Sequence, residues 1–440
     1  MSLSGELVDL IAQKPVSAPD LEAAALFVLD TLASAVGGTF TDQGRILLRW
    51  AGQADSGDPA GRDCGRRALL IGALSHILEM DDLHRASVVH PGCAVVPAAW
   101  ALAARHGSGG VALLKAVLWG YEAATRVGMA VGPEHYRIFH NTATCGPFGS
   151  AVAAGALLGL DRSQMIDALG NAGTQAAGLW QFLASGAMSK HLHAGRAAEA
   201  GVVAGELAAL GFTGAPEVLE GEKGFFAGLA PGGEPARVLA DPDAPWQLRQ
   251  TSIKPWPSCR HTHPAIDAAL ELAGELAAKG CGPEQISAIR IGCYQAARKL
   301  CDREEPQSVY EAKFSLQHSV AAALGGLAPD FDAFEAEARA AFSGLRARCR
   351  IEIEEELEAA YPAHWGARIE VTLKDGSRIR ARRRDARGDP ELPLARGEMI
   401  EKARTLCALA PGIDAGRFID GVLNLPHGGA LPTLNLGSGN

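Results

Sequence analysis

The sequence lacks the features that mark several large classes of protein. Its nine cysteines contain no C-x-x-C pair and no even spacing, which argues against a disulfide framework and against a structural zinc site. It has no P-loop, no G-x-G-x-x-G after a strand pattern and no G-x-S-x-G elbow that would present a nucleophile. Phosphate-loop nucleotide binding and serine-hydrolase chemistry are therefore not indicated.

Long apolar runs and a basic leader are also missing. No uncharged run approaches the roughly 18 apolar residues that a membrane span requires. The first residues, MSLSGELVDLIAQ, are acidic where a secretory signal is basic. Together with reduced thiols, these features predict a cytoplasmic protein that does not enter a membrane.

Positive charge is in the minority, with 41 Lys and Arg against 50 Asp and Glu and a net charge of -9. Such a chain has no global field that would attract nucleic acid or an anionic membrane, so we expect neither as a partner. The basic run IRARRRDAR at 379–387 follows a strand pattern without interleaved aromatics. We interpret it as a solvated strand edge rather than a nucleic-acid site.

Helical periodicity dominates the chain from about residue 17 to 250. Ser17 suits a helix N-cap, and Gly37 and Gly38 are expected to stop the first helix. The many Ala and Gly residues would allow the helices to pack closely. Further helices are predicted at 94–105, 111–130, 147–159, 162–180 and 194–210.

The pattern changes near residue 251. Residues 287–294 alternate like a strand, and Asp375 and Gly376 lie between two alternating runs, which indicates a hairpin. A helical pattern returns after residue 394. At 440 residues, two domains are the starting expectation. We predict a mainly α protein with a large all-α domain, 1–253 completed by 395–440, and a smaller inserted α+β domain at 254–394.

Against this Ala- and Leu-rich background, five segments concentrate His, Lys, Arg and Asp. They are EMDDLHRASVVHPG at 79–92, FHNTATCGPFG at 139–149, SKHLHAGRAA at 189–198, IKPWPSCRHTHPAID at 253–267 and AKFSLQHSV at 312–320. If the fold brings them together, they form a positively charged, proton-transferring pocket in an acidic protein. That combination predicts an enzyme that acts on a small anion.

The first two segments offer imidazoles for proton transfer. Asp81 lies close in sequence to His84 and His90, and a nearby acid raises the pKa of a histidine and orients its tautomer. His140 precedes a helix expected near 147, whose unpaired N-terminal N–H groups would favour an anion. The plainer alternatives are a capped helix end with a structural histidine, and a satisfied loop histidine.

The third and fourth segments offer cations. Lys190 lies at a helix start, where a positive charge is locally unfavourable and so hints at another use. Lys254 and Arg260 would suit a substrate with several carboxylates, because Arg forks onto a carboxylate and Lys gives a point charge. For Lys190, the alternative is a solvated side chain.

Histidines complete the last two segments. His261 and His263 resemble a metal pair, but no acidic or Cys ligand completes the set nearby, so no metal site is predicted. His318 lies on an amphipathic helix, where a core position is the alternative to a substrate contact.

Taken in order, the segments resemble the MmgE/PrpD family, which includes 2-methylcitrate dehydratases, cis-aconitate decarboxylases and iminodisuccinate epimerases. The resemblance runs from about 20 to 410. It implies a large all-α domain made from both chain ends, an inserted smaller domain, an active site in the cleft between them, a homodimer, and no cofactor. The matching stretches are LFVLDTLASAVGG, HILEMDDLHRASVVHPG, FHNTATCGPFGSAVAAGALLGLD, SKHLHAGRAAEAGVVAGELAALGFTG, IKPWPSCRHTHPAIDAALEL, EAKFSLQHSVAAAL and RGDPELPL.

Carried over by position, the resemblance implies catalytic and substrate-binding residues. The catalytic set is His140, Lys190, Asp81 and His90, and the substrate-binding set is Lys254, Arg260, His261, His84 and His318. Two departures put the characterised substrates in doubt. Where many members have Asp-x-Asp-Asp-Thr-His, this chain has Glu-Met-Asp-Asp-Leu-His, and where several have Tyr it has His318.

These observations favour a cofactor-independent lyase, 2-methylcitrate dehydratase-like, that moves a proton next to a carboxylate of a small di- or tricarboxylate. In this hypothesis Lys190 and Lys254 hold substrate carboxylates, while His140, with His90 or Lys190, moves the proton. An epimerase or isomerase, or a decarboxylase of a related polycarboxylate, is the nearest alternative. A non-catalytic carboxylate-binding protein and a metal hydrolase are others.

Overall fold

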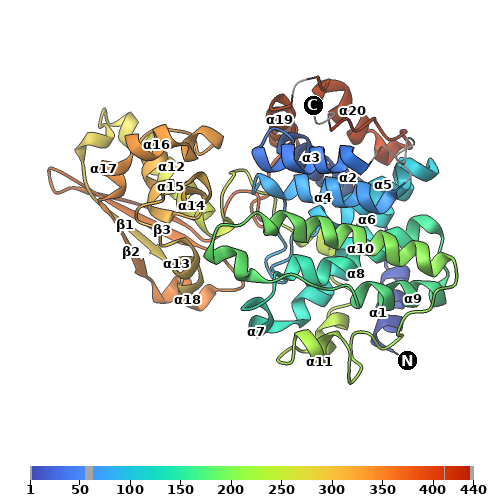
Figure 1. Cartoon of the computed structure of the whole chain (residues 1–440). Coiled ribbons are helices and arrows are strands. Elements are labelled where there is room, and N and C mark those ends of the chain that lie inside the picture. The colour runs from blue at the N-terminus through green and yellow to red at the C-terminus, as the bar shows by residue number, and fades with distance from the viewer. Residues whose placement is uncertain (1, 55–62, 411, 437–440) are drawn as a thin grey trace. The chain divides into compact units, whose positions relative to one another are not determined.

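The computed structural model describes residues 2–54, 63–410 and 412–436. The chain divides into two units, Met1–Ile253 with Ala395–Asn440 and, between them in sequence, Lys254–Leu394 (Figure 1). It is mainly α, as predicted, with one small mixed four-stranded sheet in the described residues. That the units are independently folding domains stays a prediction.

The first unit is helical wherever the structure describes regular elements of four or more residues. Its α-helices are α1 Leu3–Gln13, α2 Ala18–Gly38, α3 Asp42–Ala54, α4 Cys64–Ile77, α5 Gly92–His106, α6 Gly110–Ala130, α7 Gly132–Tyr136, α8 Asn141–Leu158, α9 Arg162–Gly173, α10 Ser189–Ala209, α11 Phe225–Leu229, α19 Arg396–Ala408 and α20 Ala415–Leu423.

Most predicted helices in this unit are present, but several bounds were wrong. Gly37 and Gly38 lie in the last turn of α2 instead of ending it. Helix α8 begins at Asn141, six residues before Pro147, because its buried packing outweighs the unfavourable proline. Helix α9 ends at Gly173, short of the predicted 180, and α3 and α4 were not predicted.

Helix α2 shows how local sequence and burial cooperate. The Ser17 backbone N–H donates to the Asp20 carboxylate at 3.0 Å, and the Ser17 hydroxyl donates to it at 2.6 Å, so the start of the helix is capped. By length and hydropathy α2 could cross a bilayer, which the sequence analysis did not anticipate. However, 78% of its apolar window is buried within the protein, which is what a core helix shows.

Close approach of α4, α5 and α10 depends on a residue without a side chain. A Cβ on Gly72 would lie 2.6 Å from the Cys93 carbonyl oxygen of α5 and 3.2 Å from the Ala194 carbonyl oxygen of α10. Gly72 therefore lets three helices meet one turn before His76. This contact sets the distance between segments that carry polar side chains.

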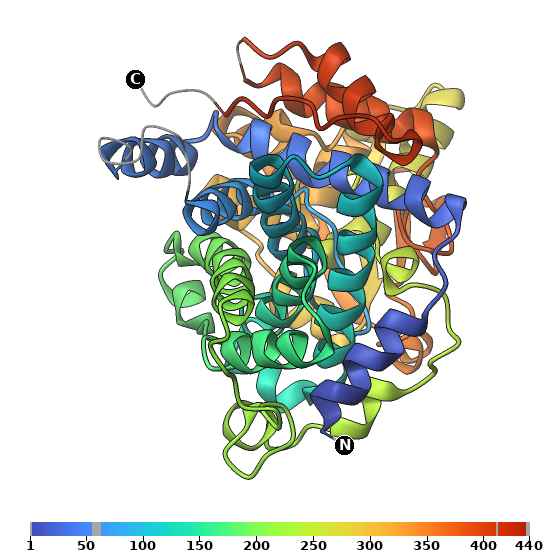
Figure 2. The ribbon, with the colours of Figure 1, turned by 90° about the vertical axis from the view of Figure 1, so that its right-hand side faces the viewer.

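The C-terminal segment completes this unit. Helices α19 and α20 pack on α2, and Figure 2 shows their red ribbons beside the blue N-terminal helices. The Lys402 ammonium on α19 pairs with Asp30 of α2 at 2.5 Å and donates to the Met80 carbonyl oxygen at 2.7 Å. The C-terminal segment thus holds the loop that follows α4.

The second unit contains the four-stranded sheet, with strand order β2-β1-β3-β4. Strand β1 pairs parallel with β2 and antiparallel with β3, and β3 pairs antiparallel with β4 through the predicted turn at Asp375 and Gly376. Helix α12 packs on β3 and β4. The elements are α12 His263–Ala278, β1 Ile286–Cys293, α13 Gln295–Cys301, α14 Val309–Lys313, α15 Leu316–Leu324, α16 Ala336–Ala341, α17 Ser343–Arg346, β2 Cys349–Ile353, α18 Glu355–Ala360, β3 Ala367–Leu373 and β4 Arg378–Arg383.

The basic run lies on edge strand β4, as predicted. Arg380 and Arg378 pair with Glu370 of the neighbouring strand, and Arg382 pairs with Glu356 at 2.6 Å. These partners are acidic residues of the same unit, so the run is part of an ion-pair network at the sheet edge.

We expect Gly72→Ala to lower the free energy of unfolding by about 1–3 kcal/mol, because a methyl group at this crowded position forces backbone to move. Gly52→Ala on α3 is the matched control, since no atom of the described residues lies within 4 Å of its Cβ position. The control should be neutral or stabilise by up to about 1 kcal/mol. Equal denaturant midpoints for the two variants would contradict the packing argument.

Candidate active site

Three of the five polar segments meet within the first unit. The ring of His76, at the end of α4, lies 4.8 Å from that of His90, 5.6 Å from that of His140 and 6.5 Å from that of His191, measured between centroids. The residues come from α4, the loop that follows it, the start of α8 and the start of α10. Four imidazoles from distant parts of the sequence therefore share one buried cluster.

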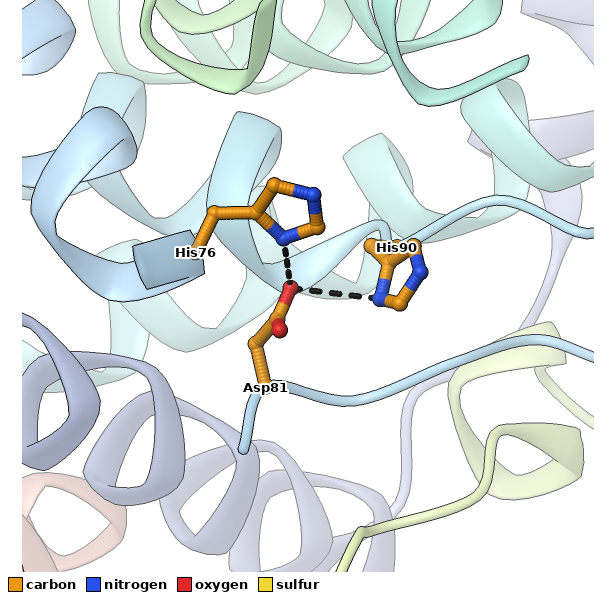
Figure 3. Close-up of side chains that lie close together, drawn as sticks. All are labelled: His76, Asp81 and His90. Carbon is orange, nitrogen blue, oxygen red and sulfur yellow. Dashed lines mark hydrogen bonds and ion pairs between the residues drawn. The ribbon is translucent and has the colours of Figure 1, made fainter. Parts of the chain in front are cut away.

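A carboxylate joins two of these imidazoles (Figure 3). The Oδ2 atom of Asp81 lies 2.6 Å from Nδ1 of His76 and 3.2 Å from Nδ1 of His90. Nδ1 of His90 also lies 2.6 Å from the Asp82 carbonyl oxygen. Because a carbonyl and an ionised carboxylate only accept hydrogen bonds, both Nδ1 atoms carry protons.

The two adjacent acids of the loop differ in their electrostatics. Burial opposes ionisation of Asp81, but the neighbouring His76 and His90 outweigh it and hold the pKa of Asp81 well below its usual range. Burial, supported by the nearby Asp81 charge, raises the pKa of Asp82 well above its usual range, although Tyr121 donates to it at 2.7 Å. Asp81 is the ionised partner in the cluster.

Lys190 is buried at the start of α10 and forms an ion pair with Glu79. Glu79 adopts a φ of 60°, a left-handed backbone conformation that is strained for a residue with a side chain. The strain places a carboxylate against an ammonium from a distant helix. This part of the cluster therefore contains an ion pair, and its net positive charge is smaller than the sequence alone suggested.

His140 is the N-cap residue of α8, and its side chain makes no capping hydrogen bond. Burial, followed by the neighbouring His76 and the Lys190 ammonium, lowers the pKa of His140 well below its usual range. Its Nδ1 lies 3.4 Å from Nδ1 of His193, and its Nε2 has no hydrogen-bond partner among the described residues. A neutral imidazole with such a buried nitrogen can form a hydrogen bond with a ligand or accept a proton.

The start of α8 holds the neighbouring loop. The Asn141 side-chain amide donates to the Ser87 carbonyl oxygen at 2.8 Å, and the backbone N–H of His90 donates to the Thr142 hydroxyl at 3.0 Å. The sequence analysis expected an anion beside His140, at the N-terminus of a helix near residue 147. The structure uses their side chains to fix the loop that carries His90.

His84 lies in the same unit with both ring nitrogens engaged by the protein. Its Nδ1 is 2.8 Å from the Ser87 hydroxyl and its Nε2 is 3.0 Å from Oε1 of Gln247. Burial lowers the pKa of His84 to about 4. These contacts give His84 a structural role, and its contact with substrate stays a prediction.

The fourth and fifth segments belong to the second unit, where the Cys259 backbone N–H donates to the Lys313 carbonyl oxygen at 2.9 Å. Arg260 is buried and pairs with Asp389 at 2.5 Å. His261 stacks on Trp365 at 4.3 Å between ring centroids, and burial lowers its pKa to about 3.

Lys254 is also buried, and Nε2 of His318 lies 2.7 Å from the Ala333 carbonyl oxygen in the core of this unit. The structure therefore brings His140, Lys190, Asp81 and His90 together in the first unit. It places Lys254, Arg260, His261 and His318 in the second. That all of them share one site stays a prediction.

Sequence reasoning missed His76 and Glu79 as members of the cluster. His76 is a single histidine within the apolar helix GALSHI, a pattern that usually marks a core residue. Glu79 was noted only as a departure from a family pattern. Its partner Lys190 lies 111 residues away, so no local signal predicts the pair.

Two groups of described residues have side-chain atoms close enough for a metal ion: His76, Asp81 and His90, and in the second unit His364, Asp385 and Glu391. In the first group, both imidazole Nδ1 atoms donate hydrogen bonds, so they are not available as ligands in this arrangement. In the second, Arg384 donates to Nε2 of His364 at 2.8 Å. In either group, a metal ion would have to replace a proton on an imidazole nitrogen that now takes part in a hydrogen bond.

Comparisons with known proteins identify the family of the chain. The sequence model of the MmgE/PrpD N-terminal domain matches residues 6–238, and that of the MmgE/PrpD C-terminal domain matches residues 256–425. The chain belongs to the MmgE/PrpD family and is an enzyme, as the sequence resemblance predicted.

Curated relatives include the cis-aconitate decarboxylase of Homo sapiens, which is 28% identical over 400 residues, 86% of this chain and 81% of the relative. The cis-aconitate decarboxylase of Mus musculus is 27% identical over 354 residues, 77% of this chain and 70% of the relative. That of Aspergillus terreus is 32% identical over 221 residues, but the match spans 47% of this chain and 45% of the fungal protein.

The half-buried imidazoles of His191 and His193 predict that acid destabilises the protein. Burial is the main cause that lowers the pKa of His191 to about 3 and of His193 to about 4. Between these values and the unfolded value of about 6.5, the unfolded chain binds more protons than the folded one, so the free energy of unfolding falls as pH falls. His191→Gln should reduce this pH dependence in melting experiments between pH 7 and 4. His427→Gln, which alters an exposed histidine, should leave it unchanged. A His191→Gln variant with the wild-type slope would show that His191 does not resist protonation.

Proposed function

We propose that this protein is a carboxylate lyase that removes carbon dioxide from a small unsaturated tricarboxylate of the cis-aconitate type. The observation that carries the proposal is the arrangement around His90. Its side chain is 12% exposed, its Nδ1 faces the ionised Asp81, and neutral His140 lies 6.3 Å away between ring centroids. Relatives that align over most of the chain and carry the name cis-aconitate decarboxylase support the choice of reaction.

In the proposed reaction, the bond between a substrate carbon and its leaving carboxylate breaks, and carbon dioxide departs. The electron pair stays on the substrate and spreads over the adjacent unsaturated carboxylate. A carbanion of this kind requires a proton donor and fixed positive charge. Protonated His90 delivers the proton to carbon, and solvent then returns a proton to His90.

The Asp81 carboxylate makes His90 suitable as that donor. An opposite charge within hydrogen-bond distance favours the protonated form of an imidazole, so His90 can carry a proton near neutral pH. His140, by contrast, is held neutral by its burial. In this assignment His90 is the acid, and His140 contacts the substrate as a neutral base or hydrogen-bond partner.

Lys190 and Lys254 hold substrate carboxylates in the proposed complex. Lys190 keeps its charge in the interior because Glu79 pairs with it. Both lysines are buried, which strengthens the attraction of each ammonium for an anion relative to water. No cofactor is needed, since the substrate itself accommodates the electron pair.

Dehydration is the second candidate, since β-elimination of water in the same setting moves a proton beside a carboxylate but expels hydroxide.

We further propose a homodimer in the cytoplasm. The spacing of the nine cysteines in the sequence, with no C-x-x-C pair, supports a reducing compartment. Exposed apolar residues on and after α10, including Val203, Leu210 and Phe212, support an oligomer.

The reaction is tested by NMR of the purified protein with a panel of di- and tricarboxylates in deuterium oxide. We expect cis-aconitate to lose one carboxylate as carbon dioxide and to gain one carbon-bound deuterium. Loss of water would identify a dehydratase, and deuterium exchange without other change would identify an epimerase or isomerase. Binding without any reaction across the panel would contradict an enzymatic role toward these acids.

Single substitutions test the residue roles. His140→Ala and Lys190→Ala should each lower kcat by about 10²–10⁴-fold, the usual contribution of a positioned proton-transfer or charge-stabilising group. His106→Ala at the exposed end of α5 is the control and should retain wild-type turnover. If both site variants fold and keep full turnover, the assignment is wrong.

A further inference from the structure

The carboxylate of Asp81 has to serve two imidazoles with one charge. His76 and His90 both approach the same oxygen, Oδ2, at 2.6 and 3.2 Å (Figure 3). One carboxylate can neutralise only one imidazolium, so the two histidines cannot share the same role. Their surroundings decide which one takes the proton.

Exposure separates the two histidines. The His76 side chain is 0% exposed, and it is surrounded by the rings of His90, His140 and His191. The His90 side chain is 12% exposed. A charge on His76 would be buried away from water, whereas water can partly solvate a charge on His90. A positive charge is therefore better solvated on the His90 ring than on the His76 ring.

Two different groups hold His90. Its Nδ1 lies 2.6 Å from the backbone carbonyl oxygen of Asp82, which is closer than the carboxylate of Asp81. The carbonyl is enough to fix the proton on Nδ1 and to orient the ring. The carboxylate adds the negative charge that a carbonyl lacks, and that charge is what stabilises a protonated ring.

A buried carboxylate without donors would take up a proton. Asp81 is fully buried, and its other oxygen, Oδ1, has no hydrogen-bond partner among the described residues. The short hydrogen bond from His76 is thus a main support for the ionised form. Removing it would leave His90 as the remaining imidazole on Asp81 Oδ2 and would raise the pKa of Asp81, which weakens the counter-charge for His90.

We propose that His76 is a positioning residue that keeps Asp81 ionised, so that the Asp81 charge sustains His90 as the proton donor of the reaction. The kinetic part rests on the proposed function, while the effect on Asp81 and His90 is a property of the protein alone. Other titratable groups face the trio and are kept constant in the test. They are Glu79 and Asp82 on the loop, Cys93 on α5, His140 on α8, and Lys190 and His191 on α10.

The test compares His76→Leu with His76→Asn in the full-length enzyme. Leucine removes the donor, whereas the Asn side-chain amide can place an N–H near the position of Nδ1. Nitrogen-15 NMR of ring-labelled histidine, recorded without substrate, should show the pKa of His90 lower in His76→Leu and largely restored in His76→Asn. The Nδ1–H tautomer of His90 should persist in both variants, because the Asp82 carbonyl is unchanged.

Activity gives the second readout. His76→Leu should lower kcat at neutral pH by about tenfold or more, with little change in KM. The pH profile of kcat should move toward acid, and His76→Asn should recover most of the loss. A His76→Leu variant that fails to fold still leaves the His76→Asn comparison with wild type.

Three results would overturn the proposal. The first is a His90 pKa that stays constant or rises in folded His76→Leu, since a rise would mean that His76 itself carries the charge. The second is loss of both Nδ1–H signals on addition of Zn²⁺ to the wild-type enzyme at a stoichiometric ratio, which would identify a metal site. The third is equal behaviour of the Leu and Asn variants. A normal NMR result without turnover on any carboxylate would instead leave His76 supported and the proposed reaction wrong.

Discussion

An ionised carboxylate inside a mainly apolar helical unit is the constraint on which the rest of the site depends. Asp81 is fully buried, and burial by itself opposes its charge. Two imidazoles on one oxygen reverse that preference. Once the charge exists, it orients the tautomers of both rings, and in the proposed reaction it makes the more exposed ring the proton donor. The chemistry of the cluster follows from how this charge is maintained.

Small residues make that arrangement possible. Gly72 lets α4, α5 and α10 approach at a distance that no side chain permits, and His76 follows one turn later on the same helix. Backbone strain also contributes, because the positive φ of Glu79 turns its carboxylate toward Lys190. Packing and backbone strain therefore set the positions of charges, and the charges set what the imidazoles can do.

Sequence alone predicted the mainly α fold and the polar segments, because helical periodicity and clustered His, Lys and Asp are local signals. These signals, together with the family resemblance, predicted Asp81, His90, His140 and Lys190 as site residues, and the structure brings these four together. His76 was missed because a lone histidine in an apolar helix looks like a core residue. The Lys190–Glu79 pair was missed because it joins residues 111 positions apart. The early start of α8 escaped prediction because buried packing overrode the preference of Pro147 for a first turn.

The link between Lys402 and the loop at Met80 has a consequence for biosynthesis. Its two ends are separated by 322 residues, and the whole second unit is translated between them. While α19 is still inside the ribosome, the face of α2 on which it packs is uncovered. The carbonyl oxygen of Met80 then also lacks its hydrogen bond from Lys402. The loop that carries Asp81 thus acquires this anchor only after the second unit and α19 have been translated, and a polypeptide that terminates before α19 lacks it.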